Sequence, residues 1–212
     1  MDVRMFTVGP VAENTFIIRR DNSDRALIVD PGDEAEKLLG AIDALGVTLD
    51  GILLTHTHFD HVGAVAPVAK AAGAEVWVPE IEAFVLADIN RFVPWPGIGP
   101  FESYEAEHTL RGGERLELAG FEIDVLFTPG HSPGHVTFSI PDETAIFSGD
   151  VLFQQSIGRT DLPGGDHATL LESIRTLVDT LPAETTVHPG HMGITSLGAE
   201  RATNPFLAEL AR

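Results

Sequence analysis

Three of the nine histidines in this 212-residue chain lie within six residues of one another. They belong to the segment HTHFDH, residues 56–61, which also contains Asp60. On a helix the side chains of His56 and His58 would diverge by roughly 200°, whereas in an extended loop they face the same way. An extended loop would let both imidazoles bind one metal ion, while Asp60 and His61 turn toward a second point. The HExxH motif differs, because its spacing needs a helix.

Three further candidate ligands each follow an apolar run that predicts a strand. They are His131, Asp150 and His191, and each stands directly after a glycine. Glycine lets two backbone segments approach closely. Because strand ends in layered α/β folds gather at one edge, we expect these side chains at the same edge as the histidine cluster.

The two groups together offer five imidazoles and two carboxylates: His56, His58, Asp60, His61, His131, Asp150 and His191. The chain has no cysteine, so disulfides, thiolate metal sites and cysteine nucleophiles are excluded. Imidazole and carboxylate ligands suit Zn, Fe or Mn. A catalytic tetrahedral zinc ion takes about three protein ligands and a water, so the set divides between two ions. The alternatives are a surface loop that binds no metal and a closed structural site, for which cysteine is usual.

The composition limits the partners. Asp and Glu number 32 against 13 Lys and Arg, which gives a net charge of −19. That charge repels a phosphate backbone and suits cations, so we expect no nucleic-acid partner. The first residues lack the basic flank and apolar run of a signal peptide, and no run approaches about 18 apolar residues. We therefore expect a cytoplasmic protein with no membrane partner.

Short apolar runs that predict strands alternate with amphipathic segments that predict helices. The expected strands cover residues 5–8, 15–19, 26–30, 51–55, 75–78, 114–118, 121–127, 136–140, 144–147 and 185–187. The first expected helix begins at the N-cap Asp33 and ends at Gly46. Another begins at the N-cap Asp166, and the others cover residues 64–72, 81–90 and 198–211.

This order predicts an α/β fold in which two β-then-α halves pack with their sheets face to face and their helices outside. No linker of domain-separating length is present, so residues 1–212 are expected to form one domain. The proline- and glycine-rich stretch 92–104 predicts an irregular loop. Its Trp95 suits either a hydrophobic entrance for a substrate or a contact in a homodimer.

The motifs taken together resemble the metallo-β-lactamase superfamily. They are HTHFDH, TPGHSPGH at 128–135, FSGD at 147–150 and HPGH at 188–191. Two further segments, SIGRTDLPGGD at 156–166 and ERATNPFL at 200–207, resemble the short bacterial glyoxalase II-like (hydroxyacylglutathione hydrolase-like) branch. The likeness runs from VDPG at 29–32 to the end of the chain and implies a four-layer αββα sandwich.

The resemblance also implies a ligand set and an activity. His56, His58 and His131 would hold the first of two divalent ions, Asp60, His61 and His191 the second, and Asp150 would bridge them. The implied reaction is hydrolysis of a small-molecule thioester similar to S-lactoylglutathione, with a hydroxide between the ions as nucleophile and Asp60 orienting it. Zinc is the expected metal, with iron or manganese as alternatives.

Other functions stay open. Full-length glyoxalase II enzymes carry a C-terminal helical domain that helps to bind glutathione, and 212 residues leave no room for it. Lysines are scarce too, so the thioester of another thiol carrier is an alternative substrate. A mononuclear iron oxygenase resembling persulfide dioxygenases would use His56, His131 and Asp150 alone. Lactam or phosphodiester hydrolysis and a metal-dependent binding module fit the sequence less well.

Several residues near these motifs have two interpretations each. Asp30 either orients a ligand or forms an Asx-turn. His135 is expected to position or pack against a ligand rather than bind metal, while His188 is ambiguous. Arg159 either binds a substrate carboxylate or braces its loop against Asp161 or Asp166. The remaining histidines, His108 and His167, are expected at the surface or in a cap.

Overall fold

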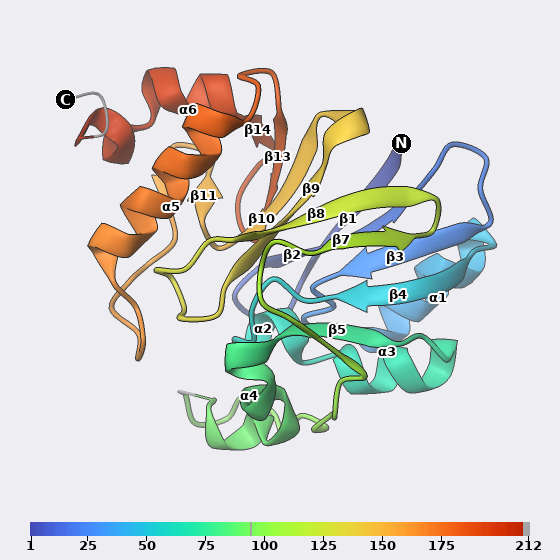
Figure 1. Cartoon of the computed structure of the whole chain (residues 1–212). Helices are drawn as coiled ribbons and strands as arrows, with labels where there is room; N and C mark the ends of the chain where they lie inside the picture. Colours follow the sequence, from blue (N-terminus) through green and yellow to red (C-terminus); the bar gives the residue numbers. More distant parts are fainter. Residues whose placement is uncertain (94, 210–212) are drawn as a thin grey trace. The chain divides into compact units, whose positions relative to one another are not determined.

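The computed structural model describes residues 1–93 and 95–209, and its elements are labelled in Figure 1. The chain divides into two compact units. One comprises Met1–Leu110 with Glu117–Phe121, and the other comprises Arg111–Leu116 with Glu122–Arg212. The prediction of a single domain over 1–212 stays a prediction.

The first unit holds a six-stranded sheet in sequence order. Its strands are β1 (Asp2–Val8), β2 (Glu13–Arg19), β3 (Arg25–Val29), β4 (Thr48–Leu53), β5 (Val76–Pro79) and β6 (His108–Leu110). The first three strands are antiparallel, and β3 to β6 are parallel. Parallel neighbours need crossover connections, which contain α1 (Ala35–Leu45), α2 (Phe59–Val62), α3 (Val65–Ala72) and α4 (Ala83–Ala87).

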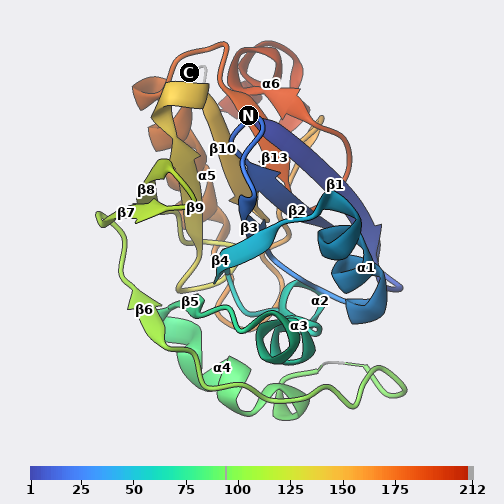
Figure 2. The same ribbon diagram turned by 90° about the vertical axis from the view of Figure 1, so that its right-hand side faces the viewer.

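Helices α1 and α3 cover one face of this sheet (Figure 2). Leu38 of α1 and Val65 of α3 belong to one buried cluster with strand residues such as Ile28. The alternate strand residues, for example Leu27 and Leu53, are fully buried as well. Burial on both faces explains the uninterrupted apolar stretches within these strands, such as ALIV in β3 and FII in β2.

The second sheet has the order β14-β13-β10-β9-β8-β7. Its strands are β7 (Arg115–Leu118), β8 (Phe121–Phe127), β9 (Val136–Ile140), β10 (Ala145–Gly149), β13 (Thr186–Pro189) and β14 (Thr195–Ser196), and a separate ribbon pairs β11 (Leu152–Phe153) with β12 (Ser156–Ile157). The helices are α5 (His167–Thr180) and α6 (Leu197–Thr203). Apolar residues of α5 pack against β10 and β13.

The strand directions explain where the second unit carries its polar residues. Strand β9 is antiparallel to both β8 and β10, and β10 is parallel to β13. Strands β8, β10 and β13 therefore run the same way and end at the same edge of the sheet. The three candidate ligands of this unit follow those three ends.

Three expectations about helices are wrong in detail. The first helix has Glu34 as its N-cap, because Asp33 accepts a hydrogen bond from the neighbouring Glu34 N–H instead. The expected helix 81–90 is split into η1 (Glu80–Glu82), α4 and η2 (Ile89–Arg91), with non-helical backbone at Asp88.

The expected helix 198–211 ends at Thr203. Asn204 is extended there because the residue before a proline avoids the helical region. A 3₁₀ turn, η4 (Pro205–Glu209), follows, and positions 210 and 211 lie outside the described residues.

The strands agree better. Residues 121–127 and 136–140 have the expected bounds, and β6, β11, β12 and β14 were missed because each has three residues or fewer. Stretch 92–104 contains no helix or strand among its described residues, and Pro94 lies outside them. Within residues 1–93 and 95–209, no helix combines the length and apolarity that crossing a bilayer requires.

Candidate metal centre

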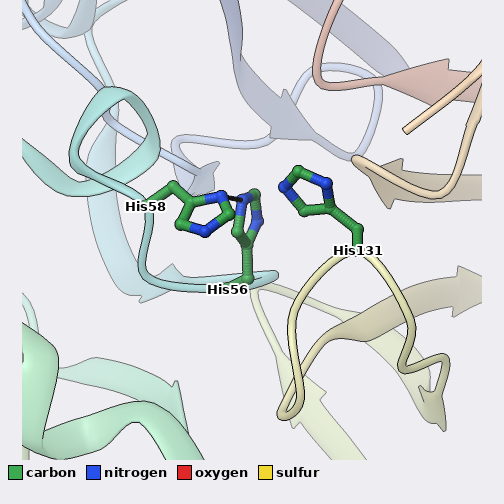
Figure 3. Close-up of side chains that lie close together, drawn as sticks. All are labelled: His56, His58 and His131. Carbon is green, nitrogen blue, oxygen red and sulfur yellow. Dashed lines mark hydrogen bonds between the residues drawn. The ribbon is translucent and has the colours of Figure 1, made fainter. Parts of the chain in front are cut away.

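The loop after β4 presents the histidine cluster. His58 has extended backbone, with φ −63° and ψ 146°, and α2 begins at the next residue. The side chains of His56 and His58 consequently face the same way, and His56 Nε2 lies 3.1 Å from His58 Nδ1 (Figure 3). Asp60 and His61 occupy the first turn of α2, and the His61 ring lies next to the His56 ring, with centroids 4.1 Å apart. The extended loop that the alternating spacing predicts is confirmed.

Asp30 positions two of these histidines by hydrogen bonds to the ring nitrogen that points away from the candidate metal site. Its Oδ2 atom lies 3.0 Å from His61 Nδ1 and accepts a 2.6 Å hydrogen bond from Thr55 Oγ1. Since the Thr55 hydroxyl proton is used there, its oxygen accepts from His56 Nδ1 at 3.1 Å. Both imidazoles thus carry their proton on Nδ1, and Nε2 is the nitrogen that each offers to a metal.

The position of Asp30 is a special one. It follows β3, and its φ of 48° is rare for a residue other than glycine, so the surrounding contacts hold it there. Its Oδ1 accepts the Thr55 N–H at 2.7 Å. This link joins the ends of two neighbouring parallel strands, β3 and β4. The side chain therefore orients the candidate ligands, and it does not form the alternative Asx-turn.

Close backbone packing fixes the turn that contains Asp60 and His61. A Cβ atom on Gly32 would lie 1.7 Å from the Asp60 carbonyl oxygen, so only glycine fits at that position. Asp60 Oδ2 lies 3.9 Å from His61 Nε2. Ligand atoms of Asp30, His56 and His61 all lie within 4.8 Å of one another.

The second unit gathers its own three candidate ligands. Asp150 Oδ2 lies 3.4 Å from His131 Nε2 and 3.6 Å from His191 Nε2. His131 stands on the loop between β8 and β9, as Figure 3 shows. Its Nδ1–H donates to the Arg159 carbonyl oxygen at 2.8 Å, so its Nε2 carries the lone pair that faces Asp150.

Two glycines make this arrangement fit. A Cβ on Gly158 would lie 1.9 Å from the Asp150 carbonyl oxygen. Gly130 has a φ of +129°, and a Cβ there would lie 2.3 Å from the Leu170 N in the first turn of α5. The loops that carry His131 and Asp150 are therefore packed directly on backbone.

The residues fit divalent metal ions by their chemistry and spacing. Two atoms bound at about 2.1 Å in tetrahedral positions lie about 3.4 Å apart. The separations from Asp150 Oδ2 to the two imidazole nitrogens, 3.4 and 3.6 Å, match that value. The donor set of imidazole nitrogens and carboxylate oxygens suits zinc, iron and manganese.

Neither His135 nor His188 is placed as a ligand. His135 Nδ1 hydrogen-bonds Thr128 Oγ1 and its Nε2 accepts the Asp150 N–H, so the ring uses both nitrogens to position Asp150. The expectation for His135 is confirmed. His188 is buried and stacks on the Phe147 ring, and burial lowers its pKa to about 4. It is a neutral packing residue.

The other polar residues near the motifs lie at the surface. The Arg159 guanidinium makes two hydrogen bonds to Asp161, at 2.6 and 2.7 Å, and holds the pKa of that carboxyl at about 2. This is the bracing role considered for Arg159. His108 is partly exposed, bonds Glu75 and stacks on the Trp77 ring, and His167 is exposed at the start of α5.

Sequence reasoning missed two buried carboxyls next to the first ligand group. Glu82 accepts hydrogen bonds from the Thr57 N–H and hydroxyl, at 2.9 and 3.0 Å, and so fixes the backbone between His56 and His58. Glu13 Oε1 lies 3.8 Å from His61 Nδ1, and burial raises the pKa of Glu13 well above its usual range. An acidic residue at the start of a fully buried strand was the available signal for Glu13.

Comparison with known proteins identifies the family. The sequence profile described as "Metallo-beta-lactamase superfamily" matches residues 8–191. The chain is 41% identical over 212 residues to the probable metallo-hydrolase YqgX of Bacillus subtilis, covering 98% of both chains. It is 37% identical over 209 residues to the hydroxyacylglutathione hydrolase GloC of Haemophilus influenzae, again with 98% of both covered.

Solved structures agree. The crystal structure of the BLEG-1 B3 metallo-beta-lactamase matches with a TM-score of 0.91 and 40% identity, covering 97% of this chain and 99% of that one. The di-iron-bound form of TTHA1623 matches with a TM-score of 0.80 and 41% identity, covering 97% and 100%. The predicted fold class, mixed α/β with two sheets, is confirmed. This chain belongs to the metallo-beta-lactamase superfamily of metallo-hydrolases.

Proposed function

We propose that this protein is a dinuclear metal-dependent hydrolase that cleaves a small-molecule thioester of the S-lactoylglutathione type. The observation that carries the proposal is the pair of ligand groups at strand ends, in a chain 37% identical to a hydroxyacylglutathione hydrolase over 98% of both lengths. His56, His58 and His131 would hold the first ion, Asp60, His61 and His191 the second, and Asp150 both.

The metal is proposed to be zinc or iron. Both accept imidazole and carboxylate ligands, and a relative 41% identical to this chain has been crystallised in a di-iron-bound form. Two bound divalent cations supply Lewis acidity and make water acidic enough to act as a nucleophile near neutral pH.

The protein's own groups position the reactants. Asp30 and Thr55 hold His61 and His56 in the tautomer that presents Nε2. Asp60, at the rim of α2 and only partly buried, accepts a hydrogen bond from the nucleophile and orients it toward the thioester carbonyl. Solvent protonates the departing thiolate, a good leaving group that needs no general acid.

The thiol carrier is proposed to be less anionic than glutathione. The chain's two lysines, Lys37 and Lys70, pair with Glu34 and Glu102. Arg159 is likewise paired, with Asp161. These three cations are thus already paired with carboxylates of the chain, which supports a thiol with fewer carboxylates than glutathione. The proposed place of action is the cytoplasm, where such thiols are kept reduced.

A second candidate function is β-lactam hydrolysis. It is favoured by the 40% identity to the BLEG-1 B3 metallo-beta-lactamase. Attack on a lactam carbonyl needs the same nucleophile, so substrate choice rather than the metal ligands separates the two activities.

The test combines elemental analysis with a substrate panel: S-lactoylglutathione, lactoyl thioesters of other small thiols, a cephalosporin and glutathione persulfide. We expect about two divalent ions per chain and thioester turnover. His58→Ala should lower metal content and turnover together, whereas His108→Ala, at a partly exposed histidine outside the candidate metal centre, should change neither. Asp60→Asn should lower kcat by about 10²–10³-fold with folding intact.

Several results would contradict the proposal. Full activity in His58→Ala would remove the two-ion assignment, and an unchanged kcat in Asp60→Asn would remove Asp60 from the reaction. One iron per chain with oxygen consumption on the persulfide would favour the dioxygenase. Turnover of the cephalosporin alone would favour the lactamase.

A further inference from the structure

A buried carboxylate in the second unit joins β14 and α6, which are neighbours in sequence, to the β11–β12 turn 45 positions earlier. Glu200, in α6, is 1% exposed. Its Oε2 atom accepts hydrogen bonds from the Gln155 N–H at 2.8 Å and from Asn204 Nδ2 at 2.9 Å, and its Oε1 accepts one from Thr195 Oγ1 at 2.6 Å. All three donors are neutral. Hydrogen bonds of a buried carboxylate to neutral donors are stronger than ordinary ones, so they fix the three segments firmly.

Asn204 extends this cluster to the β11–β12 turn. Its Nδ2 atom also donates to the Ser156 carbonyl oxygen at 2.9 Å, and its Oδ1 accepts the Phe206 N–H at 3.0 Å. The turn between the two strands contains Gln155, whose φ of 59° is unusual for a residue other than glycine. Glu200 and Asn204 together hold the turn in this conformation. They belong to the ERATNPFL segment, for which the chemistry proposed above has no use.

Both segments held by Glu200 adjoin the candidate ligand His191. Phe153, at the start of the turn, packs its ring edge-on against the His191 ring, with centroids 5.7 Å apart. His191 lies on the short loop between β13, which ends at Pro189, and β14, which begins at Thr195. The two strands are paired. The hydrogen bond to Thr195 therefore fixes the far end of the loop that carries His191.

We propose that Glu200 is a positioning residue for His191, acting through the Phe153 ring on one side and through Thr195 on the other. A role confined to stabilising α6 would need bonds within the helix, whereas two of the three bonds leave it. The inference rests on the proposed metal centre, in which His191 binds the second ion. Loss of Glu200 should free the His191 loop and ring and weaken that ion selectively.

The test measures metal binding rather than turnover. Chelator-treated protein is titrated with Zn²⁺ against a chromophoric chelator, which gives the stoichiometry and affinity of both ions. We expect Glu200→Ala to weaken one ion by about 10–100-fold, the usual effect of removing a group that supports a ligand, and to leave the other unchanged. His191→Ala should lose the same ion.

Glu200→Gln is the conservative variant. Its amide oxygen can accept from Gln155 and Asn204, and its NH₂ can donate to Thr195 Oγ1, because a hydroxyl also accepts. We expect it to retain both affinities. The matched control is Ser196→Ala, which removes the side-chain cap of α6 but none of the bonds to Glu200 and should also retain both.

Wild-type affinity for both ions in Glu200→Ala would overturn the inference, as would equal weakening of both. If Glu200→Ala does not fold, Phe153→Leu decides: selective weakening of the same ion supports the inference, and unchanged binding overturns it. Wild-type protein that binds two ions but hydrolyses no thioester would defeat the proposed function while leaving this inference standing. Wild-type protein that binds fewer than two ions would overturn both.

Discussion

At the scale of single residues, the proposed metal ligands are held by hydrogen-bond partners that are not themselves proposed to bind metal. Asp30 is hydrogen-bonded to His61 directly and to His56 through Thr55. The Arg159 carbonyl oxygen accepts a hydrogen bond from His131. Each partner fixes which ring nitrogen carries the proton, and hence which one can bind a cation. Removing such a partner typically lowers metal affinity by about 10–100-fold.

Asp30→Asn tests this role. The amide NH₂ would face the donors of Thr55 and His61, so at least one hydrogen bond would be lost. We expect zinc affinity to fall by about 10–100-fold, measured by competition with a chromophoric chelator. Asp33→Asn is the matched control, since its carboxylate only accepts the Glu34 N–H. Equal affinities in the two variants would contradict the role given to Asp30.

At the scale of elements, strand direction decides which residues meet. In the first unit, the parallel strands β3 and β4 end side by side, which brings Asp30 within hydrogen-bonding distance of Thr55. In the second unit, β8, β10 and β13 end at one edge of the sheet. Helix α5 takes part as well, because the Asp166 N–H at its start donates to the Gly130 carbonyl oxygen at 2.7 Å. The helix thus supports the loop before His131.

Asp166→Ala tests the cap of α5. The Asp166 side chain accepts the Thr169 N–H at 2.7 Å, and that hydrogen bond lowers the pKa of its carboxyl. Its loss should reduce the free energy of unfolding measured in urea titrations, because the cap satisfies a backbone N–H that has no partner within the helix. Asp179→Ala, in the last turn of the same helix, removes only an exposed ion pair with Arg201 and should cost less than about 0.5 kcal/mol. An equal loss in both variants would contradict the capping role.

The expectations for elements succeed or fail for physical reasons. Strands such as 121–127 are identified because apolar alternation is a local property of the sequence. The helix 81–90 fails because Glu82 turns inward to bond Thr57, a residue 25 positions earlier. That contact depends on the crossover between β4 and β5, which no local pattern encodes.

At the scale of the whole molecule, acid stability depends on a buried base. The folded pKa of His188 is about 4, against 6.5 when unfolded, so protonation favours the unfolded chain. Stability from this group is complete above pH 6.5 and is lost as the pH falls toward 4. The loss at pH 5 is on the order of 2 kcal/mol.

The measurement is urea unfolding of metal-free protein at pH 7 and pH 5. His188→Phe keeps a ring stacked on Phe147 but cannot titrate, so its unfolding free energy should fall less between the two pH values than that of the wild type. His108→Phe, at a partly exposed histidine that also stacks on an aromatic ring, serves as control and should follow the wild type. If His188→Phe loses as much as the wild type, the buried base is not the cause.

The sequence by itself determined the chemical types of the candidate ligands, their positions after strand ends and the family, because short motifs and apolar periodicity are local. It did not identify the roles of Glu13, Glu82 and Glu200, and it left that of Asp30 undecided. These carboxyls act on partners up to 48 positions away, such as His61 for Glu13. Tertiary structure decided their roles, since only strand pairing and crossover helices bring such residues within hydrogen-bonding distance.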